Sequence, residues 1–318
     1  MLSGFSLYYV AAIKEQQTIN SIGIFLKKRI IGIYPLYFIT YVLFVVMTYV
    51  GVHFLHIQTE DYVEVLDQII AAPVELSLLQ SIYTGSFSFL HNGGTWFLSA
   101  ILICYLIYPY IEYVVNNNNK RINSILFIIL YLVSGYSWFF INRFNFPSIY
   151  TNPLLCFCEF TIGCLVCKSV ISKQPISSNK IIQLYKVLVI LLYLILIVTI
   201  TFGVYYIGMN TEAYNFIAII IFTLILYCSS IIDLSKNNNK DTYVQRIVII
   251  FSENTYAFYL AQFFVWHPIK FLLQKKHDLF CNYELICKVF ISFALCTVIS
   301  LCFHYLFEIP IKRKFLKQ

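Results

Sequence analysis

Apolar segments about twenty residues long recur from one end of this chain to the other, separated by short polar connections. A helix of roughly 20 apolar residues spans the hydrocarbon core of a bilayer, which is about 30 Å thick. Inside that core, only helices and closed barrels satisfy every backbone hydrogen-bonding group. The sequence therefore predicts an all-α, polytopic integral-membrane helical bundle that forms one domain over residues 1–318. About nine spans are expected, at residues 1–13 (partial), 30–53, 96–115, 122–141, 153–171, 183–207, 213–232, 254–273 and 284–307.

The composition supports a membrane protein without a separate soluble domain. Hydrophobic residues make up 60% of the 318 positions and charged residues only 12%, whereas a soluble domain carries about 25% charged residues. Many of the 26 Tyr and 29 Phe lie near the ends of apolar segments, as interfacial aromatic belts do. The net charge of +7 is not gathered into a basic patch with interleaved aromatic residues. We therefore expect membrane lipid as a partner and no nucleic acid.

The distribution of Lys and Arg predicts the orientation of the spans. If the loop 14–29 is cytoplasmic, 17 of the 22 Lys and Arg fall on that side, because only Arg143, Lys270, Lys275, Lys276 and Lys288 fall on the other. Cytoplasmic loops carry such an excess of positive charge. The C-terminus is thus predicted to be cytoplasmic.

The first apolar segment is short. It ends at Lys14 and would extend only about 20 Å as a helix. Nine crossings that finish in the cytoplasm also leave residue 1 outside the cell or at mid-bilayer. Both observations lead us to expect a further helix upstream.

Most of the ten Cys lie inside apolar segments. Cys164 and Cys167 form one CxxC pair, but a zinc or redox site needs a second pair or a nearby His. We therefore expect small apolar packing residues and no metal.

The longest outer loop is predicted at residues 54–95. Its first half is acidic, whereas its second half, ELSLLQSIYTGSFSFLHNGG, is too apolar for a free loop and is broken by Gly. This second half is expected to turn back toward the membrane and cover a cavity, where irregular backbone is tolerated against protein or water. The stretch TYVQRIVIIFSEN near residue 250 is predicted to be an interfacial helix.

Polar groups inside membrane spans are costly, which makes them functional candidates. Arg29, at the cytoplasmic edge of KKRIIGIYPLYF, could bind a phosphate with two hydrogen bonds, or it could be an ordinary positive anchor. Glu159 could position a hydroxyl or hold a His, or it could form a structural hydrogen bond to a neighbouring helix. Gln262 lies near mid-bilayer, and His267 lies on another face of the same segment, where an interfacial position is favoured over catalysis.

Other candidates lie near the ends of segments. His91 and Trp96 flank a Gly-rich turn outside the membrane, where they suit an outer cavity that binds sugar rings, although Trp96 could also be an interfacial anchor. His304 and Glu308 are four residues apart and share a helix face at the cytoplasmic end. A pair at the end of a helix with no further role is the favoured interpretation. Nucleotide-binding, zinc-protease and nucleophile-elbow motifs are missing from the sequence.

Six segments, taken together, resemble the integral-membrane acyltransferase-3 family. They are LSGFSLYY, KKRIIGIYPLYF, GGTWFLSAILICYLIYP, PLLCFCEFTIGCLV, NTYAFYLAQFF and YLFEIPIKR, and they follow one another in the family's order over essentially the whole chain. The resemblance implies ten spans with both termini in the cytoplasm. It also implies transfer of an acyl group, usually acetyl, from cytoplasmic acyl-CoA to a sugar hydroxyl. The acceptor would be a cell-surface polysaccharide or its lipid-linked precursor, and the location a bacterial cytoplasmic membrane.

The resemblance extends to single residues. Arg29 matches the first member of the family's basic pair, Gly32 departs from the second, and Lys27 and Lys28 could supply the missing charge. Gln262 stands where the family has His, so it would orient a group rather than move a proton. The remaining matches are Trp96, Tyr105 and Pro109 in one motif, Glu159 and Gly163 in a second, and Glu308 and Pro310 in a third.

The resemblance places LSGF at the family's second span, so the first span, with its essential His, would lie upstream. We therefore expect these 318 residues alone to be inactive or weakly active. Within them, the expected catalytic residues are Glu159, Gln262 and His91, the expected acyl-CoA ligands are Arg29 and Lys28, and the expected substrate-binding residues are Trp96, Tyr105 and Glu308. The alternatives are a transporter of glycans or lipid-linked sugars, a catalytically inactive relative, and an enzyme that transfers succinyl or a longer acyl group.

Overall fold

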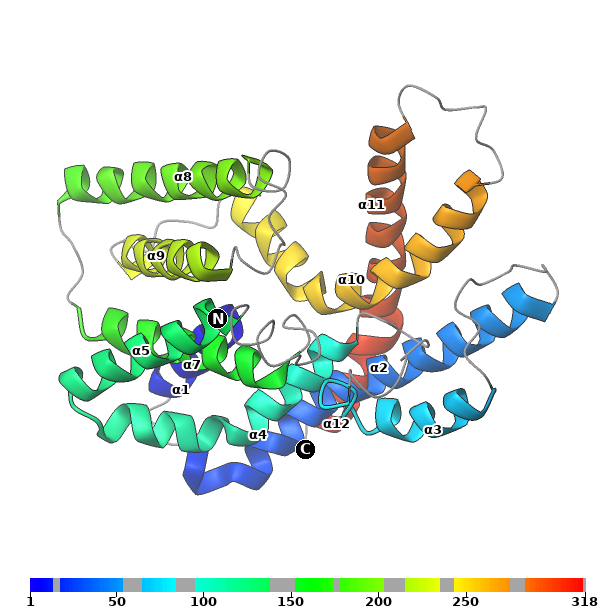
Figure 1. The fold of residues 1–318 in the computed structure, drawn as a ribbon, viewed down its shortest axis with the longest axis horizontal. Helices are drawn as coiled ribbons and strands as arrows, with labels where there is room; N and C mark the ends of the chain where they lie inside the picture. Colours follow the sequence, from blue (N-terminus) through cyan, green and yellow to red (C-terminus); the bar gives the residue numbers. More distant parts are fainter. Residues whose placement is uncertain are drawn as a thin grey trace. The chain divides into compact units, whose positions relative to one another are not determined.

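The computed structural model describes residues 1–13, 18–53, 65–83, 95–137, 152–173, 178–202, 215–234, 243–274 and 284–316 (Figure 1). These residues form helices and turns without a strand, which confirms the predicted all-α class. The helices are α1 (Leu2–Ile13), η1 (Thr18–Ser21), α2 (Ile22–His53), α3 (Val65–Leu76), α4 (Trp96–Asn117), α5 (Lys120–Gly135), α7 (Pro153–Ile171), α8 (Asn179–Phe202), α9 (Asn215–Leu234), α10 (Tyr243–Gln274), α11 (Glu284–Phe303), the π-helical turn η5 (His304–Glu308) and α12 (Ile309–Leu316).

Six helical segments among the described residues are long and apolar enough to cross a membrane. They are Ile22–Met47, Trp96–Asn117, Pro153–Ile171, Asn179–Thr201, Asn215–Leu234 and Val289–Phe315. The helix α1 is apolar but shorter, in line with a partial span. Local sequence sets several of the boundaries. The side chains of Asn119 and Asn152 cap α5 and α7 by accepting hydrogen bonds from backbone N–H groups in the first turn, and Pro153 occupies the first position of α7.

The stretch that was predicted to be a separate interfacial helix is instead the first part of α10, which runs from Tyr243 to Gln274 and is bent along its length (Figure 1). The Ser252 hydroxyl donates to the Ile249 carbonyl at 2.9 Å, and the Thr255 hydroxyl donates to the Phe251 carbonyl at 3.0 Å. Such bonds from Ser and Thr to the preceding turn bend helices. A local bend therefore replaces the expected break between two helices.

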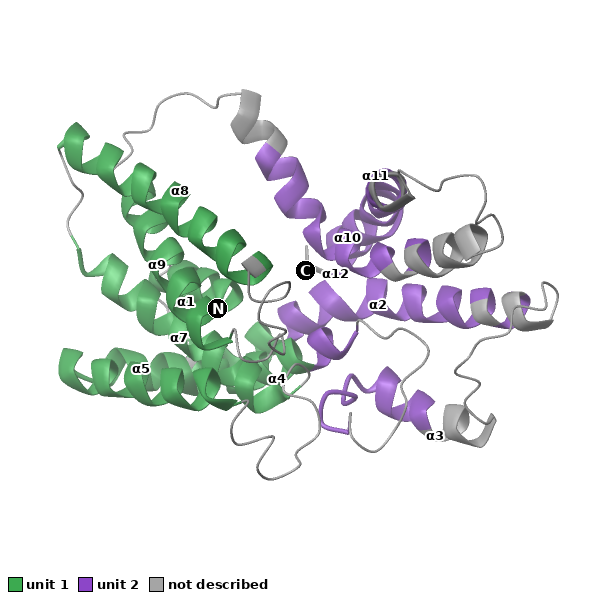
Figure 2. Ribbon diagram, turned by 45° about the horizontal axis from the view of Figure 1, so that its top comes forward, with its two compact units in different colours: residues 1–26, 100–239 green, residues 27–99, 240–318 purple. Residues whose placement is uncertain are grey.

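The chain forms two compact units, and each is assembled from two separate stretches of sequence (Figure 2). Unit 1 holds residues 1–26 and 100–239, and unit 2 holds residues 27–99 and 240–318. The boundaries fall inside α2 and α4. That the whole chain acts as one domain stays a prediction.

Unit 1 is built around α7, whose side chains from Phe160 to Cys167 are buried without interruption. The helix α1 crosses α7 at two glycines, where backbone meets backbone. A Cβ atom on Gly4 would lie 2.0 Å from the Phe160 carbonyl oxygen, and one on Gly163 would lie 2.0 Å from the Met1 carbonyl oxygen. Small residues allow helices to pack this closely in membranes. The motifs LSGF and EFTIG therefore contain the two halves of one helix crossing.

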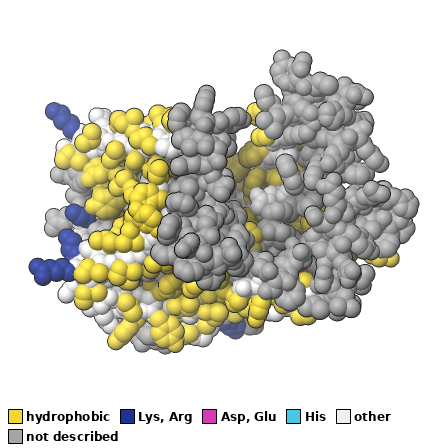
Figure 3. All heavy atoms as spheres, viewed as in Figure 1, with side chains coloured by type: hydrophobic (Ala, Val, Ile, Leu, Met, Phe, Trp, Pro, Cys, Tyr) yellow, Lys and Arg dark blue, Asp and Glu magenta, His cyan; other side chains and the backbone are white. Residues whose placement is uncertain are grey.

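The outer face of unit 1 is apolar. In α8, large side chains such as Leu184 and Val198 are exposed by 68% and 61%, respectively. Figure 3 shows apolar side chains over much of the described surface on this side, with Lys and Arg side chains at its left edge. A continuous apolar surface of this kind fits contact with lipid. It agrees with the coarse prediction of a membrane protein.

In unit 2, the residues after α3 pack inside the protein as a series of turns. Leu78, Gln80 and Ser81 are buried, and Leu78 has a φ of 55°. The Gln80 amide donates to the carbonyl and the hydroxyl of Thr95 at 3.0 and 3.1 Å. The hydroxyls of Ser81 and Ser99 are 2.7 Å apart. The second half of the outer loop is thus packed against protein at Leu78, Gln80 and Ser81, whereas Ile82 and Tyr83 are exposed and part of the acidic first half lies outside the described residues.

Replacing Ser99 with Val is expected to destabilise unit 2. The change removes the bond to the Ser81 hydroxyl and the 3.1 Å bond from the Ser81 N–H. Losing buried hydrogen bonds of this kind costs about 1–3 kcal/mol. Thermal unfolding in detergent measures the loss. Ser77→Ala is the matched control, since Ser77 is exposed and bonds only locally to Pro73. An equal loss in both variants would contradict the expectation.

Candidate active site

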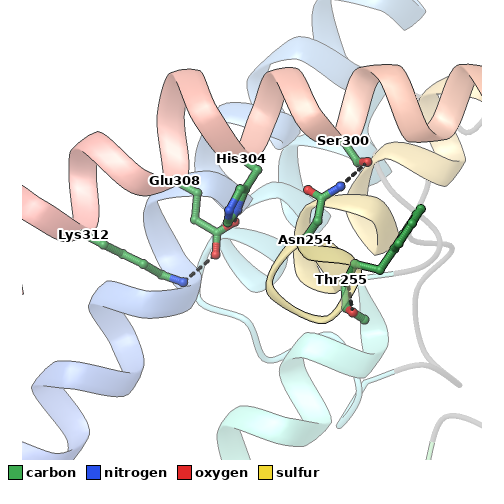
Figure 4. Close-up of polar contacts among 7 residues, drawn as sticks. Asn254, Thr255, Ser300, His304, Glu308 and Lys312 are labelled. Atoms are coloured by element: carbon green, nitrogen blue, oxygen red, sulfur yellow. Dashed lines mark hydrogen bonds and ion pairs between the residues drawn. The ribbon is translucent and has the colours of Figure 1, made fainter. Parts of the chain in front are cut away.

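Polar side chains form a stripe along the last membrane helix. Ser300, His304, Glu308 and Lys312 follow one another at intervals of four residues (Figure 4). Four residues of a regular α-helix turn through about 400°, so such a stripe would drift around the helix by about 40° at each step. Residues His304–Glu308 adopt the wider π-helical turn, which reduces this drift. Isolated π turns are frequent at functional sites.

Glu308 is the central member of this stripe. One carboxylate oxygen lies 2.8 Å from His304 Nδ1, and the other lies 2.5 Å from Lys312 Nζ. The side chains of Glu308 and His304 are only 3% and 10% exposed, whereas that of Lys312 is 41% exposed. The stripe therefore runs from a buried imidazole, through a buried carboxylate, to a cation that reaches the surface.

The helix α10 supplies the other polar groups around this stripe. The Asn254 amide donates to the Ser300 hydroxyl at 2.8 Å, and both residues are buried (Figure 4). The Asn254 carbonyl oxygen is buried without a hydrogen-bond partner among the described residues. The Tyr256 hydroxyl donates to the Ile33 carbonyl of α2 at 2.6 Å. Three helices thus meet around the stripe.

Arg29 lies on α2, four residues before Ile33, which is about one helical turn. Arg29 is partly buried, and the neighbouring Lys27 and Lys28 are exposed. The Tyr256–Ile33 bond therefore holds the helix of Arg29 against α10, which in turn packs against the His304–Glu308 stripe. The sequence linked Arg29 and Glu308 only through the family resemblance, and the fold brings their helices together within unit 2.

Aromatic rings border this site. Phe264 makes edge-to-face contacts with Phe44 and Phe303, each with ring centroids 5.7 Å apart. Phe307 packs against Phe303 at 6.4 Å. Apolar surroundings lower the local dielectric constant and strengthen the interactions among the polar groups they enclose.

The other predicted site residues are divided between the two units. Trp96 and Gln262 belong to unit 2 and are partly buried, and the Trp96 ring packs edge-on against Phe97 at 5.9 Å. Gln262 lies on α10 eight residues beyond Asn254, about 12 Å along the helix axis. His91 lies outside the described residues, as does the side chain of His267.

Glu159 and Tyr105 belong to unit 1. Glu159 is partly buried on α7 and accepts a long hydrogen bond of 3.4 Å from the Ser134 hydroxyl of α5. The sequence left two roles open for Glu159, catalysis or a structural hydrogen bond to a neighbouring helix. The bond to α5 is a hydrogen bond of the second kind. Tyr105 packs edge-on against Phe160 at 6.2 Å. A catalytic role for Glu159 and a substrate contact for Tyr105 stay predictions.

The burial of His304 is the main point that sequence reasoning missed. The spacing of four residues between His304 and Glu308 was recognised, and a pair at the end of a helix was the favoured interpretation. The structure shows this pair, with both residues buried inside unit 2. The stripe that continues to Ser300 and Lys312 was the available signal.

The chemistry of this arrangement suits proton transfer beside an anionic ligand. An imidazole oriented by a carboxylate is a good general base near neutral pH. An Arg side chain binds phosphate through paired hydrogen bonds. Among the described residues, no group of three His, Cys, Asp or Glu could hold a metal ion. The eight described cysteines are free, and six of them are buried.

Comparison with known proteins agrees with this picture. A family model described as an acyltransferase domain, that of the acyltransferase-3 family, matches residues 1–305. Neither a curated protein nor a solved structure gave a match. The matched range includes Arg29, Asn254 and His304 and ends three residues before Glu308. The match covers nearly the whole chain, which therefore belongs to the acyltransferase-3 family of membrane acyltransferases.

Proposed function

We propose that this protein transfers an acyl group, most simply acetyl, from cytoplasmic acyl-CoA to a hydroxyl of a cell-surface polysaccharide or its lipid-linked precursor. Family membership supports acyl transfer in general. The observation that carries the proposal is the meeting of three helices in unit 2. It joins the helix of a partly buried Arg to α10, which also packs against the turn that holds a buried His–Glu pair.

We assign the binding of acyl-CoA, the acyl donor, to the basic residues near the start of α2. CoA carries three phosphate groups, and Arg29 would contact them with two hydrogen bonds while Lys28 adds an exposed positive charge. Gly32 leaves room beside Arg29, since a Cβ atom there would meet nothing within 4 Å. These residues fit a phosphorylated donor whose adenosine part stays at the membrane surface.

The acceptor is assigned to the opposite side of the membrane. By the family resemblance, Trp96, Tyr105 and His91 would contact the sugar, and Glu159 and Gln262 would orient reacting groups. The location is a bacterial cytoplasmic membrane, with the C-terminus in the cytoplasm. Charge supports this orientation, because α12 ends in Arg313 and Lys314.

Acyl transfer can be tested directly with the full-length protein in lipid nanodiscs. Labelled acetyl-CoA is supplied together with a membrane extract that contains lipid-linked glycans, and label is sought in the glycan fraction. Transfer of label supports the proposal. Binding of glycan without a need for acyl-CoA, and without transfer of label, would support a transporter instead. Binding of neither acyl-CoA nor glycan would overturn the proposal. Succinyl-CoA and longer acyl-CoAs in parallel reactions identify the preferred acyl chain.

Two substitutions on α2 should change acyl-CoA affinity in opposite directions. Arg29→Ala is expected to raise the Kd about tenfold, because a hydrogen bond between charged groups contributes about 1.5–3 kcal/mol. Gly32→Arg is expected to lower the Kd several-fold, because it adds a second cation in open space one turn away. Calorimetry measures both. Gly32→Ala is the control that adds bulk without charge, and a Kd unchanged by Arg29→Ala would remove Arg29 from the donor site.

A further inference from the structure

We propose that His304, oriented by Glu308, accepts the proton of the hydroxyl that receives the acyl group. This inference rests on the proposed function, because it assigns one step of acyl transfer to one residue of the site in unit 2. It gives the site a base on the last membrane helix, at a position that the sequence alone left as an ordinary pair at a helix end.

The first argument is the state of the imidazole. Glu308 is the hydrogen-bond partner of Nδ1, at 2.8 Å, and an ionised carboxylate can only accept hydrogen bonds. The proton of the neutral ring must therefore be on Nδ1. The lone pair is then on Nε2, for which no hydrogen bond is found among the described residues. A His oriented through Nδ1, with Nε2 left to take a proton, is the arrangement of the general base in catalytic triads.

The second argument is how firmly the ring is held. The His304 and Glu308 side chains are almost fully enclosed, and the π-helical turn brings them onto one face. Lys312 holds the second oxygen of Glu308 at 2.5 Å. The ring of Tyr305 also contacts the imidazole edge-on, with centroids 5.2 Å apart. The orientation of the ring is thus set before any substrate arrives.

The third argument is the neighbourhood of the donor. The last helix packs against α10, and α2 contacts α10 through the Phe44–Phe264 ring pair and the Tyr256–Ile33 bond, one turn from Arg29. If Arg29 binds the phosphates of acyl-CoA, the thioester at the far end of the flexible pantetheine arm can extend along α2 into the protein. His304 is buried on the neighbouring last helix, beyond Glu308 when counted from the basic C-terminal end.

The step balances in atoms and charge. His304 Nε2 takes the proton of the acceptor hydroxyl while its oxygen bonds to the thioester carbonyl carbon. The C–S bond then breaks, and the departing CoA thiolate takes the proton from Nε2. The products are the O-acyl sugar and CoA thiol, and His304 returns to its neutral form. General base catalysis of this kind contributes about 10²- to 10⁴-fold to the rate.

The test compares His304→Ala and His304→Gln with the unchanged protein in nanodiscs. Both variants should bind acyl-CoA within about threefold of the parent Kd, and both should lose about 10²- to 10⁴-fold in kcat. Added imidazole should restore at least about tenfold of the kcat of the Ala variant, whose cavity can admit the ring. Lys314→Ala, at an exposed cation on α12, is the control and should keep the parent activity.

The outcomes separate the inference from the proposed function. Near-parental kcat in both His304 variants would overturn the inference while acyl transfer by the parent stands. Loss of activity with a lower melting temperature and no rescue by imidazole would show a structural role and also overturn it. If the parent neither binds acyl-CoA nor transfers label, the proposed function itself fails.

Discussion

Replacing Gly163 with Ala should force α1 away from α7 and unfold much of unit 1. The new Cβ atom would lie 2.0 Å from the Met1 carbonyl oxygen and 2.9 Å from its carbon, and these are backbone atoms. A flexible side chain could turn aside, but the Met1 carbonyl accepts a hydrogen bond from the Phe5 N–H at 3.1 Å, so its displacement also disturbs the first turn of α1. Overpacking in a well-filled core costs about 1–3 kcal/mol, and occasionally more. We place this substitution above the upper end of that range.

Gly4→Ala should have the same effect from the other side, since its Cβ atom would lie 2.0 Å from the Phe160 carbonyl oxygen. The double variant should cost less than the sum of the two, because both changes break one crossing. Gly32→Ala is the matched control, with nothing within 4 Å of its Cβ. It should be neutral or stabilising by up to about 1 kcal/mol, because Ala favours the helix. Melting temperature in detergent measures all four proteins, and equal stability of the Gly163 and Gly32 variants would contradict the crossing.

Replacing Glu308 with Ala is expected to destabilise unit 2 by about 1–3 kcal/mol, because the buried Nδ1–H of His304 loses its hydrogen-bond partner. Lys312→Ala should cost less than about 1 kcal/mol, because Lys312 is 41% exposed and water screens its charge. The carboxylate therefore stabilises the fold mainly through His304. Chemical unfolding in mixed micelles of the single and double variants gives the two coupling energies.

The coupling between His304 and Glu308 should exceed that between Lys312 and Glu308. Glu308→Leu combined with His304→Phe should recover much of the lost stability, because apolar side chains can replace a buried polar pair. Recovery of stability without recovery of acyl transfer would separate the structural role of the pair from its chemical one. A larger coupling for Lys312 would place the stabilising interaction at the surface and contradict this account.

The membrane helices were predictable because each needs about 20 apolar residues and each connection carries polar ones. The predicted segment 153–171 coincides with α7, and 213–232 differs from α9 by two residues at each end. The prediction was wrong where two helices were expected near residue 250. Hydropathy rises from TYVQRIVIIFSEN to the following span, but this rise does not show whether a bend or a break in the helix lies between them.

The candidate site was less predictable, because burial depends on which helices pack together. Arg29, His304 and Glu308 were each recognised, yet nothing in their local sequence shows that α10 joins the helix of Arg29 to the last span. The bond from Tyr256 to Ile33 does so across 223 residues. The glycines at positions 4 and 163 were likewise seen as parts of motifs. Only the packing of α1 against α7 shows that both glycines let the two backbones approach closely.

The discontinuous make-up of the units has a consequence for synthesis at the ribosome. Residues 100–239 of unit 1 are made in one run, so most of that unit can pack while translation continues. The packing of unit 2 is completed later, because Ile33 is made 223 residues before its partner Tyr256. At about 5–20 residues per second, this delay is roughly ten to forty-five seconds. During that time Arg29 is already in the membrane, whereas α10 and the helix of His304 have not yet been made.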